Sequence, residues 1–282
     1  MQIIRELKPL RAAVAALRAD GGRVAFVPTM GALHAGHLAL VHAARAHAEH
    51  VVASIFVNPL QFAAHEDLGT YPRREAEDAA LLEREGCRLL WSPDVATMYP
   101  AGFATGVQVG GVTGDLEGAA RPGHFEGVAT VVIKLLNQVA PDVAVFGDKD
   151  FQQMAVVRRM VRDLDMPVEI VGVPVQRDAD GVALSSRNAY LSTSERRAAR
   201  ALPRALLEAA QAIAGGGRVA DAVVAAKEAL LAAGFSSVDY VELRDAETLT
   251  RLAEPVRPGR LLAAARIGRT RLLDNVPVPA RA

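Results

Sequence analysis

The residues with the clearest potential for chemistry are two histidines three positions apart. His34 and His37 lie in a turn that also carries Gly31 and Gly36, and the turn follows a short apolar stretch that ends at Pro28. Glycine lets the main chain approach a ligand closely, and the N–H groups at the start of a helix attract anions. Because both rings can face the same side at this spacing, the turn is typical of a phosphate site. The alternatives are two ordinary histidines that cap a helix, or a zinc site. Zinc is disfavoured because no cysteine cluster or second histidine pair lies at ligand spacing.

Two further polar stretches follow predicted strands. Asn58 and Gln61 carry amides, which donate and accept hydrogen bonds and therefore suit a substrate with hydroxyl groups. The alternative is a plain turn fixed by the intervening proline. In the stretch 146–153, Lys149 could reach a phosphate and Asp150 could accept ribose hydroxyls. An ordinary helix start would explain the acidic residues of this stretch through the helix dipole, but it would not explain Lys149.

A third polar stretch consists of Ser185, Ser186 and Arg187. Two hydroxyls followed by a guanidinium can form a mobile phosphate clamp, although an exposed polar loop is the alternative. Residues 121–125, RPGHF, form another polar loop before a helix, and their type alone assigns them no role. The sequence has no nucleophile elbow, no P-loop and no dinucleotide fingerprint, which argues against a triad hydrolase, a P-loop kinase and a dehydrogenase.

The elements that must position these residues follow from the apolar pattern. We predict strands at 24–27, 51–57, 88–91, 143–146 and 168–173, and helices at 7–20, 37–50, 74–85, 127–139 and 151–164. Nearly continuous apolar strands that alternate with helices indicate an α/β fold, a Rossmann-like parallel sheet with helices on both faces. Ligands bind beyond the carboxyl ends of the strands in such sheets, which is where the polar motifs fall.

The pattern changes after residue 175. Alanine-rich helical stretches at 194–215 and 218–234 are followed by short predicted strands at 238–243, 260–265 and 270–273. We therefore predict a domain at 1–175 and a smaller C-terminal α+β domain at 176–282, joined through residues 176–187.

Composition narrows the class of protein. The 282 residues include 32 Lys or Arg and 32 Asp or Glu, and this neutrality argues against an extended nucleic-acid surface. A single cysteine, Cys87, excludes an internal disulfide framework. Apolar runs stay below the roughly 18 residues of a membrane span, and the first residues lack the form of a signal peptide. We expect a cytoplasmic protein that binds no membrane and no nucleic acid.

Taken together, the motifs closely resemble those of the pantothenate synthetase (pantoate–β-alanine ligase) family. This family belongs to the nucleotidylyltransferases with a His-x-Gly-His signature. The resemblance rests on PTMGALHAGH at 28–37, FVNPLQF at 56–62, YPR at 71–73, FGDKDFQQ at 146–153 and SSRN at 185–188. It runs in order along almost the whole chain and is strongest from 24 to 191. One departure is Leu184, where the family usually has methionine.

The resemblance implies a reaction in two steps. The carboxylate of pantoate attacks the α-phosphate of ATP, which gives pantoyl adenylate and diphosphate. The amine of β-alanine then displaces AMP to give pantothenate. Neither step needs a covalent protein nucleophile, so the protein supplies alignment and stabilises charge on phosphate. The family also implies a homodimer.

The resemblance assigns most of the polar motifs to ATP. His34, His37 and Lys149 are the implied catalytic residues, which stabilise charge on the phosphates. The implied ATP-binding set is Met30, His34, His37, Gly147, Lys149, Asp150, Ser185, Ser186 and Arg187. Mg²⁺ is expected to arrive with ATP and to bridge its phosphates, with Asp78 as the protein residue near it.

The implied pantoate site consists of neutral side chains. Gln61 and Gln153 would bind the hydroxyls and carboxylate, and Asn58 and Met30 would complete the site. A related enzyme that adenylylates a phosphate substrate would need a more basic pocket. A tRNA synthetase would need a basic extension that this neutral chain lacks. A non-catalytic nucleotide sensor would bind ATP without turnover and would have no need of these amides.

Overall fold

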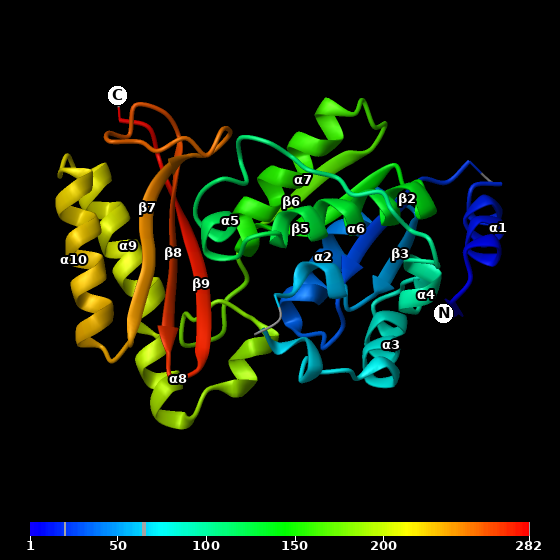
Figure 1. The fold of residues 1–282 in the computed structure, drawn as a ribbon, viewed down its shortest axis with the longest axis horizontal. Helices are drawn as coiled ribbons and strands as arrows, with labels where there is room; N and C mark the ends of the chain where they lie inside the picture. Colours follow the sequence, from blue (N-terminus) through cyan, green and yellow to red (C-terminus); the bar gives the residue numbers. More distant parts are fainter. Residues whose placement is uncertain (20, 64–65, 282) are drawn as a thin grey trace. The chain divides into compact units, whose positions relative to one another are not determined.

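The structure is a computed structural model that describes residues 1–19, 21–63 and 66–281 (Figure 1). It folds as two compact units. The first comprises Met1–Asp148 and Val156–Pro174, and the second comprises Lys149–Ala155 and Val175–Ala282. The short stretch Lys149–Ala155 groups with the second unit, which its sequence did not indicate.

The first unit is built on a six-stranded parallel sheet with the order β1-β4-β3-β2-β5-β6. Its strands are β1 (Gln2–Ile4), β2 (Val24–Thr29), β3 (His50–Ile55), β4 (Leu89–Trp91), β5 (Val143–Gly147) and β6 (Glu169–Val173). The parallel sheet confirms the predicted fold class. Strand β1 was not predicted, because only Ile4 of its three residues is buried and it lacks the apolar run that marks β4.

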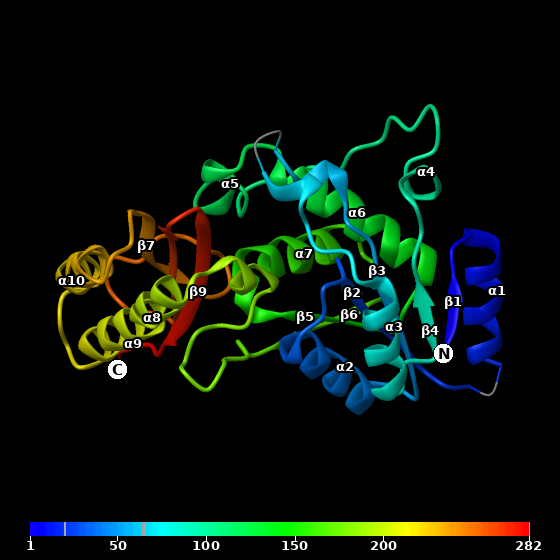
Figure 2. The same cartoon turned by 90° about the horizontal axis from the view of Figure 1, so that it is seen from below.

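Helices cover both faces of this sheet, as predicted. The helices that start in this unit are α1 (Leu7–Leu17), α2 (Ala35–His47), α3 (Glu75–Arg84), α4 (Val95–Met98), α5 (Glu117–Ala120) and α6 (His124–Val139). Figure 2 shows α2 and α6 on opposite faces. Val27, Val41, Leu82 and Val143 belong to the core between the sheet and one helical layer. The four-residue helices α4 and α5 lie below the length at which periodicity is informative.

Among the described residues, three short 3₁₀ turns precede helix α7 in the chain. Turn η1 (Pro59–Gln61) follows β3, η2 (Asp67–Gly69) follows η1, and η3 (Asp148–Asp150) joins β5 to α7 (Phe151–Asp163). Helix α7 starts in the second unit and continues in the first.

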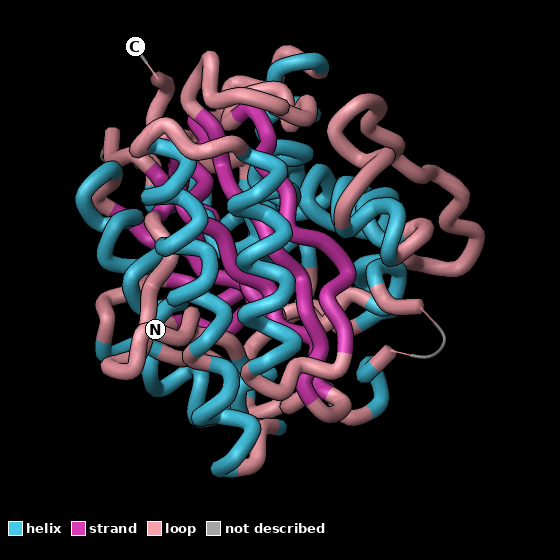
Figure 3. Tube along the Cα trace, turned by 90° about the vertical axis from the view of Figure 1, so that its left-hand side faces the viewer, coloured by secondary structure: helices cyan, strands magenta, loops and turns pink. Residues whose placement is uncertain are grey.

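The second unit packs helices against an antiparallel three-stranded sheet, β7-β8-β9 (Figure 3). Its strands are β7 (Ser237–Asp245), β8 (Gly259–Ile267) and β9 (Thr270–Val278), and its helices are α8 (Thr193–Ala199), α9 (Ala201–Ala214) and α10 (Val219–Ala232). Turn η4 (Ser186–Tyr190) precedes α8. The core contains Leu206, Ile213, Leu230 and Leu261. The helical stretch predicted at 194–215 consists of two helices that meet at Arg200.

Strand β9 is longer than its sequence predicted. We expected it to end at Leu273, but it continues to Val278. Asp274 is fully buried in the strand and forms a bidentate ion pair with Arg177, with N–O distances of 2.7 and 2.9 Å. This pairing makes an acidic residue tolerable inside the unit.

Across the described residues, no helix combines the length and the apolar character that a membrane crossing would require.

Candidate active site

His34 and His37 form a reciprocal cap at the start of α2. Nδ1 of His34 accepts the main-chain N–H of Gly36 at 3.1 Å, and Nδ1 of His37 accepts the N–H of His34 at 3.3 Å. The two ring centroids are 4.1 Å apart, and the rings are tilted by 35°. The turn therefore brings both predicted histidines together at the carboxyl end of β2.

These caps determine where each ring carries its proton. A main-chain N–H can only donate, so Nδ1 of both rings must be an unprotonated acceptor. A neutral ring then carries its hydrogen on Nε2. The capping role and the predicted phosphate role of His34 and His37 therefore use different ring atoms, and the two interpretations of these residues are compatible.

Asp78 of α3 holds the turn that precedes these histidines. Its two carboxylate oxygens accept the main-chain N–H groups of Ala32 and Leu33, both at 2.8 Å. Gly31 has a φ of +82°, and a Cβ there would lie 3.0 Å from Asp78 Oδ2. Asp78 is only 2% exposed. Because both oxygens are engaged and the carboxylate is buried, its contacts do not fit the magnesium role predicted for it.

Main-chain atoms determine the orientation of the Asn58 amide, which in turn orients the amide of Gln61. Asn58 Oδ1 accepts the N–H of Leu60 at 3.3 Å, and Nδ2 donates to the carbonyl of Gly127 at 3.1 Å. The same Nδ2 donates to Oε1 of Gln61 at 3.1 Å. Nε2 of Gln61 is therefore on the other side of its amide, where it donates to Sδ of Met30 at 3.2 Å. Three residues predicted to bind pantoate thus lie together.

Helix α6 approaches η1 closely at Gly127. A Cβ there would lie 2.2 Å from the carbonyl oxygen of Leu60. Only glycine leaves room for this approach, which allows Asn58 to reach across to the helix.

In the second unit, three of the four predicted phosphate residues line one small pocket. Lys149, Ser185 and Arg187 contribute to its wall, together with Arg271 and Asp274. The main-chain carbonyl of Lys149 accepts a hydrogen bond from Asn275 at 3.0 Å. The sequence pattern missed Arg271 and Asp274, because they lie on β9 at a distance in sequence from every motif.

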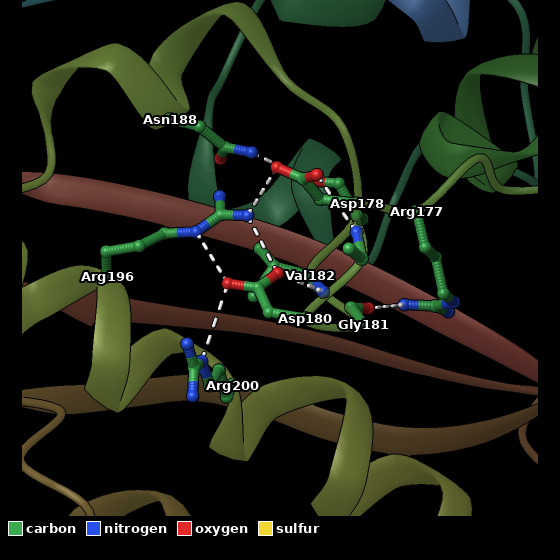
Figure 4. A network of polar contacts seen from close by, with 10 residues as sticks. Arg177, Asp178, Asp180, Gly181, Val182, Asn188, Arg196 and Arg200 are labelled. Atoms are coloured by element: carbon green, nitrogen blue, oxygen red, sulfur yellow. Dashed lines mark hydrogen bonds and ion pairs between the residues drawn. The ribbon is translucent and has the colours of Figure 1, made fainter.

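Ion pairs hold the segment that leads to Ser185 (Figure 4). The Arg196 guanidinium donates to Asp180 at 2.8 and 2.9 Å and to Asp178 at 2.8 Å. Asn188 donates to the carbonyl of Ala183 at 2.9 Å. Burial alone would raise the pKa of Asp180, but the Arg196 hydrogen bond, the main-chain N–H of Val182 and the charges of Arg196 and Arg200 together hold that pKa below its ordinary value.

The predicted site residues divide between the two units. Met30, His34, His37, Asn58, Gln61, Asp78 and Gly147 lie in the first unit, and Lys149, Asp150, Gln153, Ser185, Ser186 and Arg187 lie in the second. Gly147 ends β5, Asp150 is exposed, and Gln153 is half-buried in the first turn of α7. Within the part of the chain that the structure describes, no three His, Cys, Asp or Glu side chains gather as a metal site.

Sequence comparison places the whole chain beside one family. A model of the family described as pantoate-beta-alanine ligase matches residues 2–277. The chain is 61% identical over 278 residues to pantothenate synthetase of Sphingopyxis alaskensis, covering 99% of this chain and 100% of that one. It is 63% identical over 278 residues to the Rhizorhabdus wittichii pantothenate synthetase, covering 99% of each.

Solved structures show the same likeness. The crystal structure of pantothenate synthetase from Thermus thermophilus matches with a TM-score of 0.94 at 51% identity, covering 99% of this chain and 100% of that one. Pantoate-beta-alanine ligase from Francisella tularensis, complexed with beta-gamma ATP and beta-alanine, matches with a TM-score of 0.82 at 30% identity. That match covers 98% of this chain and 97% of the other.

Proposed function

The chain belongs to the pantoate–β-alanine ligase family, and from this membership we propose that it condenses (R)-pantoate with β-alanine at the expense of ATP. The products are pantothenate, AMP and diphosphate. The carboxylate of pantoate attacks the α-phosphate of ATP and releases diphosphate, and the amine of β-alanine then attacks the acyl carbon and releases AMP. The geometric observation that supports the ATP-dependent step is the pair of histidine rings at the start of α2, with Nδ1 of each used in a cap.

In the first unit, His34 and His37 act on the phosphates. Their Nε2–H groups donate to phosphate oxygens and stabilise the charge that develops as pantoate attacks. Because the caps fix the ring orientations before substrate arrives, little reorganisation is needed during the step. Met30 lies at the start of the turn, beside the Gln61 amide.

Pantoate is bound through neutral groups. Gln61 presents an N–H₂ group, because its oxygen is already engaged by Asn58. A donor in this position suits the carboxylate or a hydroxyl oxygen of pantoate. We assign Gln153 of α7 to the same substrate on the strength of its motif.

In the second unit, Lys149 and the segment Ser185–Arg187 bind the phosphates. Their shared pocket supports this assignment, because Lys149, Ser185 and Arg187 line a common space and offer the residue types that bind phosphate. We assign Asp150 to ribose and Gly147, at the end of β5, to the close approach of the nucleotide.

Mg²⁺ is proposed to enter with ATP. Asp78 does not fit as its ligand, because both of its carboxylate oxygens accept main-chain hydrogen bonds. Phosphate oxygens and water are sufficient ligands for Mg²⁺, which usually retains several waters. We further propose a cytoplasmic homodimer with a nucleotide-binding domain at 1–175 and a smaller domain at 176–282, and that the enzyme binds neither membrane nor nucleic acid.

The decisive experiment measures AMP and diphosphate while each substrate is omitted in turn. With ATP and pantoate alone, we expect diphosphate release up to about one equivalent of enzyme, and AMP formation only after β-alanine is added. Binding of ATP with no pantoate-dependent diphosphate would refute the proposal and favour a nucleotide sensor.

A further inference from the structure

The polar loop at 121–125 forms a network around the main chain of Gln61. His124 Nδ1 lies 2.9 Å from the carbonyl oxygen of Gln61, and an Arg121 N–H lies 3.3 Å from the same oxygen. A second guanidinium nitrogen of Arg121 lies 3.0 Å from His124 Nε2. Glu66 binds the remaining face of the guanidinium at 2.6 and 2.7 Å. Two side chains therefore converge on one carbonyl.

The partners of His124 determine its protonation. A carbonyl can only accept and a guanidinium can only donate, so Nδ1 must carry a hydrogen and Nε2 must carry none. Burial, followed by the charge of Arg121, lowers the pKa of His124 below 6.5. The carbonyl of Gln61 and the carboxylates of Glu117 and Glu66 act in the opposite direction but are outweighed. His124 is thus a neutral ring in the Nδ1–H form at neutral pH.

Gln61 is held at its side chain as well. Asn58, which is 1% exposed, donates to the side-chain oxygen, and the Tyr99 hydroxyl donates to Asn58 Oδ1 at 2.7 Å. Burial raises the pKa of Tyr99, which keeps this hydroxyl protonated. With its main-chain oxygen and side-chain oxygen both engaged, Gln61 presents Nε2 toward Met30.

We propose that Arg121 and His124 are positioning residues for Gln61: the Nδ1–H form of His124 and the guanidinium of Arg121 hold its carbonyl so that its side-chain N–H₂ group is directed at pantoate. This inference rests on the proposed function, because it takes pantoate as the ligand of Gln61. Glu66 completes the device by orienting the guanidinium. In this proposal, Arg121 and His124 act through Gln61 and do not contact the substrate themselves.

Two substitutions separate the atoms of the ring. Asparagine at 124 places an amide nitrogen near the Nδ1 position and retains the donor, whereas glutamine places its amide near Nε2 and loses that donor. We expect His124→Gln to raise the KM for pantoate about tenfold, the effect of one lost hydrogen bond, and His124→Asn to change it by about twofold or less. The KM for ATP should stay unchanged in both. Glu126→Gln, on the exposed face of the same helix, is the matched control.

The tautomer can be read without activity. In wild-type protein labelled with ¹⁵N-histidine, the signal that disappears in His124→Asn should show a protonated Nδ1 and an unprotonated Nε2 near pH 7. An Nε2–H ring or an imidazolium would overturn the inference. Equal losses toward pantoate and ATP in the glutamine and asparagine variants would also overturn it, because they would indicate a merely structural role. Absence of any pantoate-dependent turnover in the wild type would refute the proposed function, and the ring signals would still decide the arrangement of the network.

Discussion

Replacement of Asp78 by asparagine tests whether this carboxylate anchors the phosphate turn or binds magnesium. Asparagine keeps one oxygen for either Ala32 or Leu33 and presents an N–H₂ group to the other main-chain N–H. The change removes one charge-assisted hydrogen bond and leaves a buried donor facing another donor. We expect a loss of about 2–4 kcal/mol in the free energy of unfolding, since each such bond contributes about 1.5–3 kcal/mol.

The assay is thermal unfolding of the protein without ATP or Mg²⁺, followed by diphosphate release at increasing Mg²⁺. The loss should lower Tm by about 5–10 °C. The rate of adenylate formation should also fall, because the turn before His34 is no longer held, while the Mg²⁺ concentration for half-maximal rate stays the same. Glu77→Gln is the control, because it makes the same charge change at the adjacent, exposed position of α3.

A magnesium ligand would behave in the opposite way. If Asp78→Asn left the ligand-free Tm unchanged and raised the Mg²⁺ requirement, the anchoring role would be refuted and the magnesium role supported. The anchoring role changes the Tm of the ligand-free protein, whereas the magnesium role changes the Mg²⁺ requirement of the reaction. A general loss of activity would therefore not be mistaken for either result.

Three further predictions concern single positions. His37→Ala should slow diphosphate release in a single turnover by about 10²–10³, the usual effect of removing one charge-stabilising donor, and should lower stability by about 1 kcal/mol through the lost cap; a normal rate would remove His37 from the mechanism. Gly127→Ala places a methyl group 2.2 Å from the Leu60 carbonyl, so we expect about 1–3 kcal/mol of destabilisation in urea and a raised KM for pantoate; unchanged values for both would show that α6 and η1 do not need this approach. The lowered pKa of His124 means that, below pH 6.5, the unfolded chain binds a proton that the folded chain does not. Stability should therefore be complete above pH 6.5 and fall as the pH decreases toward the folded pKa, and urea midpoints in His124→Asn should lack this component.

Much of the first unit could be predicted from sequence because its central strands are short, apolar and largely buried. Residues 24–27 and 143–146 are almost wholly apolar and are buried in the sheet, so the pattern reported their environment directly. The predicted end of strand β9 was wrong because its buried positions are not all apolar. Its Asp274 is buried through an ion pair with Arg177, a residue 97 positions away, and no local pattern encodes that partner.

The candidate site was predictable only where the residues are adjacent in sequence. The pair His34 and His37 falls within one turn, so its spacing was informative. The contacts of Asp78 with Ala32 and Leu33 span 46 and 45 positions, and those of Arg121 with Glu66 span 55. One signal was present: Asp78 falls on the buried face of α3, next to Ala79 and one turn before Leu82. A carboxylate on an apolar helix face needs partners, and this could have indicated an anchoring role.

Asp78 and His124, the two anchors of the first unit, bind main-chain groups of opposite polarity. Asp78 of α3 accepts from the N–H groups of the turn that follows β2, and His124 of α6 donates to the carbonyl in the turn that follows β3. Each helix thus supplies one buried polar side chain that satisfies a main-chain group beyond a strand end. Because these main-chain groups are already paired within the protein, the turns need not be ordered by substrate, and binding energy is kept for the transition state. Loss of either anchor should therefore cost more free energy in kcat/KM than in the free energy of unfolding.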